Sequence, residues 1–318
     1  MDSFQVRLKA IRWEAQGINT YELRPLPGQE LPPFTAGAHI DVHLPSGLIR
    51  SYSLCNPQFE RHRYVIGVNK DANSRGGSAF MHESLRVGDV LTIAGPRNNF
   101  PLAEDARHSV LIAGGIGITP LWCMVQRLQE LGRSWELYYC VRNRQCAAFL
   151  DDLRGLGERV HTNLHFNFDQ EPGGQLLDLA KVVGAAPPDA HLYCCGPLPM
   201  LAAFEQATAG LPSERVHVEY FAAKEAPDTS GGFTVELAKS KRVIKVAPGK
   251  TILDAVLDEG IDVPYSCMEG VCATCETRVL DGIPDHRDLV LSKEEQAANK
   301  TMMICCSGAK SERLVLDL

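Results

Sequence analysis

The cysteine pattern near the C-terminal end constrains this chain more than any other feature of its sequence. Cys267, Cys272 and Cys275 follow the spacing C-x4-C-x2-C, and the adjacent pair Cys305 and Cys306 comes about thirty residues later. Three closely spaced thiolates and a distant fourth are the ligand pattern of a plant-type [2Fe–2S] cluster. The sequence therefore predicts a module that carries single electrons.

A structural zinc site is the competing explanation for these cysteines. Zinc sites usually place short C-x2–4-C pairs at both ends and frequently include histidine, whereas here one triplet has one distant partner. Gly270 inside the loop lets the backbone approach a cluster without a Cβ. The spacing thus favours iron and sulfide. A resemblance to plant-type ferredoxins favours Cys305 as the fourth ligand, and the sequence alone leaves Cys306 as the alternative.

The length and composition of the chain indicate a larger enzyme. At 318 residues it exceeds a ferredoxin module, and two or three domains are expected. The opening segment MDSFQVRLKAIRW alternates like a strand and does not resemble a signal peptide, and no apolar run is long enough to span a membrane. We therefore expect a cytoplasmic protein with reduced thiols. A net charge of −7 without a Lys/Arg block argues against a nucleic-acid partner.

The hydrophobic pattern changes along the chain. Residues 1–103 contain short β-patterned runs separated by turn residues, which predicts an antiparallel sandwich or small barrel. Residues 104–224 alternate strand and helix patterns, which predicts an α/β domain with a parallel sheet. The polar segment 225–232, EAPDTSGG, is expected to be a linker. Residues 233–318 would then form the ferredoxin domain.

Two glycine-containing turns lie at strand ends in the α/β segment. They are GGIGITP, residues 114–120, with Thr119 as the expected helix N-cap, and YCCGP, residues 193–197. Such turns direct free N–H groups and the positive end of a helix toward a phosphate. Close packing of helix on strand is the alternative explanation, and the spacing is not G-x-G-x-x-G. Two loops at one sheet edge nevertheless predict a bound dinucleotide.

Two motifs in the first segment together suit a flavin phosphate and ring. The run 50–53, RSYS, ends a β-pattern, and its alternation places Arg50 and Tyr52 on one face. The run 75–78, RGGS, precedes a short helical pattern and offers glycine N–H groups, a hydroxyl and a cation. A solvated strand face and an ordinary helix cap are the alternatives for each motif taken singly.

Taken in order, these motifs and the segment EYF at residues 219–221 resemble the phthalate dioxygenase reductase and vanillate demethylase reductase family, within the ferredoxin–NADP reductase superfamily. The resemblance covers essentially the full chain. It implies an FMN-binding β-barrel, an NAD-binding α/β domain and a C-terminal β-grasp ferredoxin domain. It also implies an NADH-dependent oxidoreductase that passes single electrons to a terminal Rieske-type oxygenase.

The resemblance further implies roles for individual residues. Thr119 would lie between the nicotinamide loop and the flavin, Cys195 beside the nicotinamide, and Phe221 over the isoalloxazine. Without the family, Cys195 and Phe221 would be ordinary apolar residues. The residues expected at the cofactors are Arg50, Ser51, Tyr52, Ser53, Arg75, Gly76, Gly77, Ser78, Gly115, Gly117, Thr119, Cys195, Gly196, Pro197 and Phe221, and the metal ligands are Cys267, Cys272, Cys275 and Cys305. FMN is expected rather than FAD because RGGS replaces the pyrophosphate motif of FAD relatives.

Electron counting supports this assignment. A nicotinamide releases two electrons as hydride, a [2Fe–2S] cluster accepts one at a time, and a flavin can do both. Two other functions compete. One is a stand-alone flavin reductase or diaphorase, and the other is a [2Fe–2S] redox sensor, which would leave both phosphate loops unexplained.

Charged residues bear on the donor and the acceptor. Arg142 and Arg144 follow the second strand of the α/β segment, where a cation could meet the 2′-phosphate of NADPH, so the expected preference for NADH rests on the family resemblance. Acidic residues before and inside the cluster loop predict a rim that attracts a basic partner, with a solvated surface as the alternative. They are Asp254, Asp258, Glu259, Asp262 and Glu269.

Overall fold

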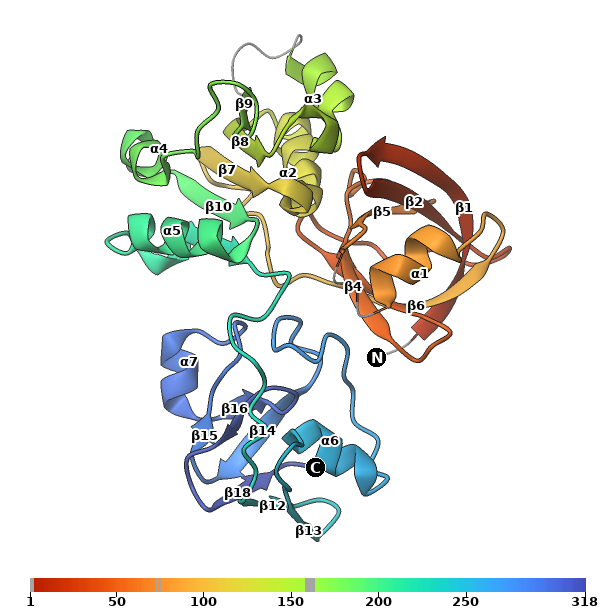
Figure 1. Ribbon diagram of the computed structural model, residues 1–318, viewed down its shortest axis with the longest axis vertical. Helices are drawn as coiled ribbons and strands as arrows, with labels where there is room; N and C mark the ends of the chain where they lie inside the picture. Colours follow the sequence, from red (N-terminus) through yellow and green to blue (C-terminus); the bar gives the residue numbers. More distant parts are fainter. Residues whose placement is uncertain (1–2, 73, 75, 158–163) are drawn as a thin grey trace. The chain divides into compact units, whose positions relative to one another are not determined.

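The computed structural model describes residues 3–72, 74, 76–157 and 164–318 (Figure 1). The pattern of contacts divides the chain into two compact units, Met1–Glu219 and Tyr220–Leu318. The larger unit holds an antiparallel sheet and a parallel sheet, and the smaller unit holds a mixed sheet. Of the helices in the described ranges, none has both the length and the apolar character needed to cross a membrane.

An antiparallel sheet forms the first part of the larger unit, with strand order β4-β3-β6-β1-β2-β5. Its elements are β1 (Ser3–Ala15), β2 (Ile18–Pro25), β3 (His39–His43), β4 (Ile49–Ser53), β5 (Tyr64–Asn69), α1 (Gly77–Glu83) and β6 (Val90–Arg97). Alternating residues of the strands, such as Val6 and Leu8, are fully buried in the core. Leu54, just beyond β4, bridges Ile66 of β5, so the two edge strands meet and the sheet closes into a barrel.

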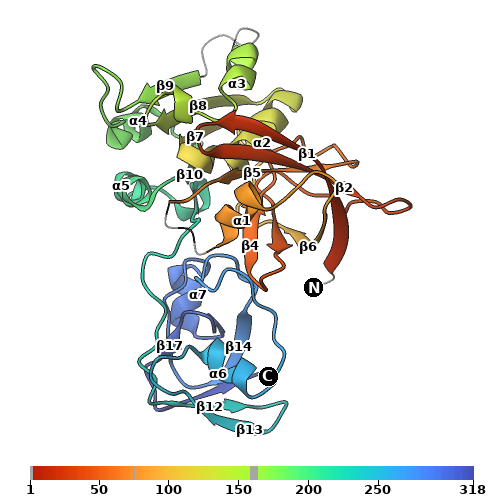
Figure 2. The same cartoon turned by 45° about the vertical axis from the view of Figure 1, so that its right-hand side comes forward.

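A five-stranded parallel sheet forms the rest of the larger unit, with strand order β11-β10-β7-β8-β9. Its strands are β7 (His108–Gly114), β8 (Ser134–Val141), β9 (Leu164–Phe168), β10 (His191–Cys195) and β11 (Val216–Glu219). Its helices are α2 (Ile118–Glu130), α3 (Leu150–Gly157), α4 (Leu179–Ala185) and α5 (Leu198–Thr208), with short 3-10 turns η1 (Gly115–Gly117), η2 (Arg144–Cys146) and η3 (Ser213–Arg215). Figure 2 shows these yellow and green strands beside the red and orange strands of the barrel. The strand order reverses at β7, and such a switch point is where ligands bind in open α/β sheets.

The smaller unit contains a five-stranded sheet in the order β13-β12-β18-β14-β16. Its elements are β12 (Thr234–Leu237), β13 (Arg242–Lys245), α6 (Ile252–Asp258), β14 (Glu276–Asp281), β15 (Pro284–Asp285), α7 (Lys293–Ala298), β16 (Thr301–Met303), β17 (Gly308–Ala309) and β18 (Arg313–Leu316). Strands β12 and β18 run parallel and the other pairs are antiparallel. Helix α6 begins at a capping box formed by Thr251 and Asp254, and its apolar face is buried in the core of this unit. The expected barrel, parallel sheet and C-terminal β-grasp domain are confirmed in this order.

The segment 225–232, which we expected to be an interdomain linker, is attached to the smaller unit. The backbone N–H of Asp228 donates to the carbonyl of Cys306 at 2.7 Å, and its buried carboxylate lies 3.5 Å from the guanidinium of Arg287. The N–H of Gly249 donates to the carbonyl of Thr229 at 2.8 Å. The contacts divide the chain a few residues earlier, after Glu219. The three boundaries between the four predicted segments stay predictions.

Candidate functional site

Four cysteine side chains come together in the smaller unit. The thiol of Cys267 contacts those of Cys272 and Cys305, and the thiol of Cys305 also contacts that of Cys275. The N–H of Glu269 donates to the Cys267 sulfur at 3.3 Å, and the Cys267 N–H points at the Cys272 sulfur at 3.5 Å. Backbone donors directed at sulfur are a property of iron–sulfur loops.

The winding of the loop explains how these donors reach the sulfurs. Met268, Gly270 and Ala273 adopt φ angles of 58°, 69° and 62°. Left-handed conformations cost energy in residues other than glycine, so their recurrence in one short loop indicates a functional constraint. A Cβ on Gly270 would collide with the sulfur of Cys306, which explains the glycine at this position.

The two candidates for the fourth ligand differ in their surroundings. Cys305 contacts Cys267 and Cys275 as well as Cys306, whereas the Cys306 thiol contacts Cys305, donates to the carbonyl of Met303 at 3.7 Å and lies behind Gly270. Within the described ranges, no three His, Cys, Asp or Glu side chains are grouped so that they could hold a single metal ion. An all-thiol set with N–H donors fits a [2Fe–2S] cluster, and Cys305 fits the fourth position better than Cys306.

The larger unit brings together the two motifs expected to bind the flavin. Arg50 on β4 lies against the turn that begins α1, because a Cβ on Gly77 would be only 2.7 Å from its Nε. One nitrogen of Arg50 donates to the carbonyl of Ile49 at 2.8 Å. Tyr52 is the next residue on the same face of β4, and burial raises the pKa of its phenol. A cation, two glycines and an aromatic ring thus share one site.

The remaining residues of these two motifs have mixed roles. The hydroxyl of Ser51 donates to Asp41 at 2.7 Å, so it supports the strand pairing, and Ser53 is buried. The hydroxyl of Ser78 lies 3.0 Å from that of Ser74, which accepts the N–H of Gly76 at 3.2 Å. Ser74 is a residue that the sequence analysis did not single out. Arg75 lies outside the described residues.

The glycine turn after β7 combines packing with an open surface. A Cβ on Gly117 would collide with the carbonyl of Cys195, and one on Gly114 would meet Pro197 and Gly196. Close packing therefore explains these two glycines of the turn. Gly115 has a φ of +54° and no atom within 4 Å of where its Cβ would lie, so its backbone faces open space as a ligand loop requires.

Thr119 lies between this turn and the barrel. Its methyl group contacts Gly67 of β5, its hydroxyl donates to the carbonyl of Ile116 at 2.9 Å, and the residue is 1% exposed. The expectation that Thr119 caps α2 is wrong. The 3-10 turn η1 runs directly into the helix, so α2 begins at Ile118 with Gly117 as its N-cap.

The other two residues expected at the reacting rings are Cys195, at the end of β10, and Phe221, two residues after β11. Cys195 ends β10 and is fully buried, and burial raises the pKa of its thiol. Phe221 belongs to the smaller unit and is 42% exposed. The structure thus places Cys195 at the sheet edge that carries the two loops. Phe221 follows the last strand of that sheet in the sequence.

Glu219 is a functional candidate that the sequence analysis missed. It pairs with Cys195 in the register of β10 and β11, and burial raises the pKa of its carboxyl to about 8. Its Oε2 atom is buried and has no hydrogen-bond partner within the described part of the chain. The signal in the sequence is that Glu219 is the single acidic residue within the mostly apolar run VHVEYF, residues 216–221. A carboxylic acid that stays protonated near neutral pH thus lies next to Cys195.

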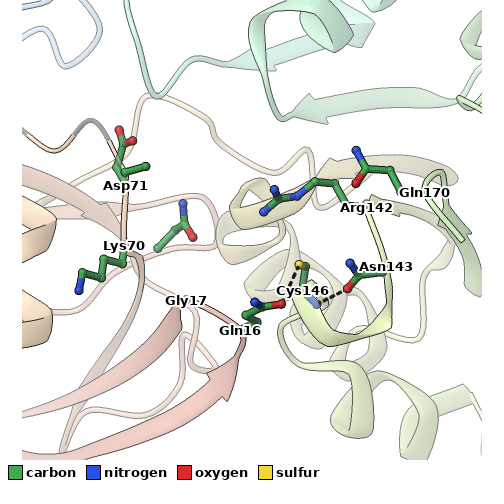
Figure 3. Close-up of a pocket in the computed structure, with 10 residues that line it drawn as sticks. Gln16, Gly17, Lys70, Asp71, Arg142, Asn143, Cys146 and Gln170 are labelled. Carbon is green, nitrogen blue, oxygen red and sulfur yellow. Dashed lines mark hydrogen bonds between the residues drawn. The ribbon is translucent and has the colours of Figure 1, made fainter.

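A polar pocket of about 510 Å³ lies between the barrel and the edge of the parallel sheet (Figure 3). It is lined by residues of the β1–β2 turn, of the segment after β5, and of the turns after β8 and β9, among them Gln16, Lys70, Asp71, Arg142, Asn143 and Gln170. Figure 3 shows the guanidinium of Arg142 extending into it. The pocket adjoins the carboxyl ends of β8 and β9, where the sugar of a dinucleotide is bound in α/β sheets.

Comparisons with known proteins agree with this arrangement. Residues 111–206 match an oxidoreductase NAD-binding domain family, and residues 235–310 match a 2Fe-2S iron-sulfur cluster binding domain family. The chain is 57% identical over 318 residues to the phenoxybenzoate dioxygenase subunit beta of Ectopseudomonas oleovorans. The matched region covers 100% of this chain and 98% of that protein.

Two further proteins match this chain over almost its whole length. The vanillate O-demethylase oxidoreductase of a Pseudomonas species is 45% identical, over 99% of both chains. The solved structure of phthalate dioxygenase reductase, described as a modular structure for electron transfer from pyridine nucleotides to [2Fe-2S], is 37% identical with a TM-score of 0.75, covering 99% of this chain and 98% of that chain. The chain therefore belongs to the phthalate dioxygenase reductase and vanillate O-demethylase reductase family of flavin- and [2Fe–2S]-containing oxidoreductases.

Proposed function

We propose that this chain is the reductase component of a Rieske-type oxygenase system, with NADH as donor, FMN as the bound flavin and a separate oxygenase as acceptor. The contact of Cys305 with Cys267 and Cys275 carries the proposal, because it completes a four-thiol set in a chain that also has a nucleotide edge. Relatives named as parts of phenoxybenzoate, vanillate and phthalate oxygenase systems support this choice of acceptor.

The residues of the larger unit would hold the flavin and orient the nucleotide. Arg50 and the turn Gly76–Ser78 would bind the phosphate of FMN, and Tyr52 would contact its ring system. FMN, when bound, converts a two-electron hydride into single electrons. Arg50 and this turn would suffice, since FMN has one phosphate group.

The sheet edge would position the nicotinamide. The exposed backbone of Gly115 and the segment Gly196–Pro197 would hold the pyrophosphate, and Gly117 would keep the two loops in contact. Thr119 and Cys195 would exclude water from the reacting rings, and Phe221 would cover the flavin until the nicotinamide replaces it. Hydride transfer requires no general base, so these residues act by placement.

The cluster-binding residues would pass electrons out of the molecule. Cys267, Cys272, Cys275 and Cys305 would hold the irons, and the N–H groups at Cys267 and Glu269 would stabilise the negative charge on sulfur. Three residues of the predicted acidic rim have partners of their own. Asp254 closes the capping box of α6, Asp258 pairs with Lys250, and Glu259 pairs with Arg242 at 3.6 Å. We therefore expect the rim to attract a basic partner only weakly.

The proposal is tested by reducing a purified Rieske oxygenase with NADH under anaerobic conditions. Wild type should reduce the oxygenase, and Cys305→Ser should lose this activity while still reducing a small-molecule dye with NADH. Equal oxygenase reduction by both proteins would show that electrons bypass the cluster. A wild type that reduces only the dye would support a stand-alone flavin reductase instead.

A further inference from the structure

Two arginines, Arg142 and Arg144, follow β8, and the surroundings of their side chains differ. Arg144 forms an ion pair with Glu171, with 3.2 Å between its Nε and the carboxylate Oε2. The other carboxylate oxygen of Glu171 accepts the backbone N–H of Arg144 at 3.0 Å. The guanidinium also lies over the ring of Phe168, 4.8 Å from its centroid. A carboxylate and an aromatic ring thus hold Arg144 from two sides.

Arg142 has a different environment. Its guanidinium extends into the polar pocket (Figure 3), and no hydrogen bond or ion pair of this side chain is formed with the residues that the structure describes. Its carbonyl accepts the N–H of Gln170 at 2.9 Å, which fixes the backbone of the turn after β8 to the turn after β9. Arg142 therefore offers an unengaged cation to a phosphate, whereas the guanidinium of Arg144, although 58% exposed, already has a carboxylate partner.

The turn after β9 carries negative charge on both sides of Gln170, the residue of this turn that lines the pocket. Glu171 has a side chain that is 28% exposed, so it is close to water but held by Arg144. Asp169, two residues earlier, has a buried Oδ1 atom without a hydrogen-bond partner in the described part of the chain. In α/β nucleotide sites an acidic residue at the strand ends binds the ribose 2′-hydroxyl, and an arginine accommodates a 2′-phosphate.

We infer that Glu171 determines the preference of this site for a 2′-hydroxyl over a 2′-phosphate, because it neutralises and holds the arginine that would otherwise bind the phosphate. This inference rests on the proposed reductase function and names a specificity residue within the same site. Glu171 is a positioning residue, since it acts through Arg144. A phosphate entering here would lose an arginine partner and meet a carboxylate.

The test compares Glu171→Gln with wild type. Glutamine keeps the size and the acceptor for the Arg144 N–H but removes the charge, so the protein should fold and still oxidise NADH. The ratio of kcat/KM for NADH to that for NADPH should fall by about tenfold, the factor equivalent to about 1.4 kcal/mol. A binding measurement by calorimetry, with 5′-AMP and 2′,5′-ADP as probes, should show the same shift in favour of 2′,5′-ADP.

Three further variants make the result specific. Glu171→Gln combined with Arg144→Ala should lose the gained affinity for 2′,5′-ADP, because the released arginine is then absent. Arg142→Gln should weaken both probes by similar factors. Glu130→Gln, which breaks an ion pair with Arg127 on the surface of α2, is the matched control and should change neither ratio.

An unchanged ratio of the two probes in Glu171→Gln would overturn the inference. So would a shift that persists after Arg144 is removed. Both results would leave the reductase function intact as long as NADH still reduces the flavin. Failure of the wild type to oxidise NADH would refute the proposed function itself.

Discussion

The buried carboxyl of Glu219 makes stability depend on pH in a defined direction. Burial raises its pKa to about 8, compared with 4.5 for an ordinary glutamate. Between these values the native state keeps a proton that the unfolded chain has lost. The free energy of unfolding therefore falls as the pH rises from about 4.5 to about 8, and this contribution stays constant at higher pH.

The size of this effect follows from the width of the interval. Each pH unit in which the proton count differs by one changes the free energy of unfolding by about 1.4 kcal/mol. Over the interval set by Glu219 the loss approaches about 5 kcal/mol as an upper bound, and structural relaxation around the charged carboxylate reduces it. Glu219→Gln removes the charge and keeps the shape. This variant should match wild type near pH 5 and be more stable by a few kcal/mol at pH 9.

Two measurements check this reasoning. A ¹³C NMR titration of the glutamate side chains should show one carboxyl with an apparent pKa near 8 that is absent in Glu219→Gln. Thermal unfolding of both holoproteins between pH 5 and 9 should give midpoints that diverge as the pH rises. A Glu219 that titrates near 4.5, or midpoints that stay parallel, would refute the raised pKa of this carboxyl.

Three more outcomes are expected. Flavin released by heat and separated by chromatography should be FMN, because the turn Gly76–Ser78 and Arg50 offer one phosphate site; recovery of FAD would contradict this. Asp228→Ala should destabilise the smaller unit by about 2–3 kcal/mol in denaturant unfolding, because it leaves Arg287 without one partner and removes the acceptor for the N–H of Ser230 at 3.0 Å; a change below about 0.5 kcal/mol would show that the attached segment contributes little. Oxygenase reduction should slow only slightly with added salt, since Asp258 and Glu259, two of the acidic residues before the cluster, each form an ion pair; a steep dependence would restore the acidic docking rim.

The sequence predicted those features that depend on local spacing. The cysteine triplet, the order of strand and helix patterns and the two glycine turns are all read from neighbouring residues, and each appears in the structure where it was expected. Arg50 and Gly77 were also predicted to share a site, and the structure brings them together.

Features that depend on side-chain direction were not predictable in this way. Cys305 and Cys306 are adjacent in sequence, and only the turn after β16 directs one sulfur to Cys267 and the other behind Gly270. The sequence likewise cannot separate a packing glycine such as Gly117 from one that faces open space.

Tertiary pairing was the other source of missed residues. Arg144 and Glu171 lie on two different turns of the parallel sheet, and their pairing depends on the register of β8 with β9. Without that pairing, the two arginines after β8 looked equivalent, so the sequence left the choice between NADH and NADPH to family resemblance.

The central claim is that electrons from NADH reach a cluster held by Cys267, Cys272, Cys275 and Cys305. Electron paramagnetic resonance of the NADH-reduced protein tests it most directly, in wild type, Cys305→Ser and Cys306→Ser. Wild type and Cys306→Ser should show the signal of a reduced plant-type [2Fe–2S] cluster, and Cys305→Ser should lose or strongly alter it. An unchanged signal in Cys305→Ser, or no cluster signal in wild type after NADH is added, would contradict the account.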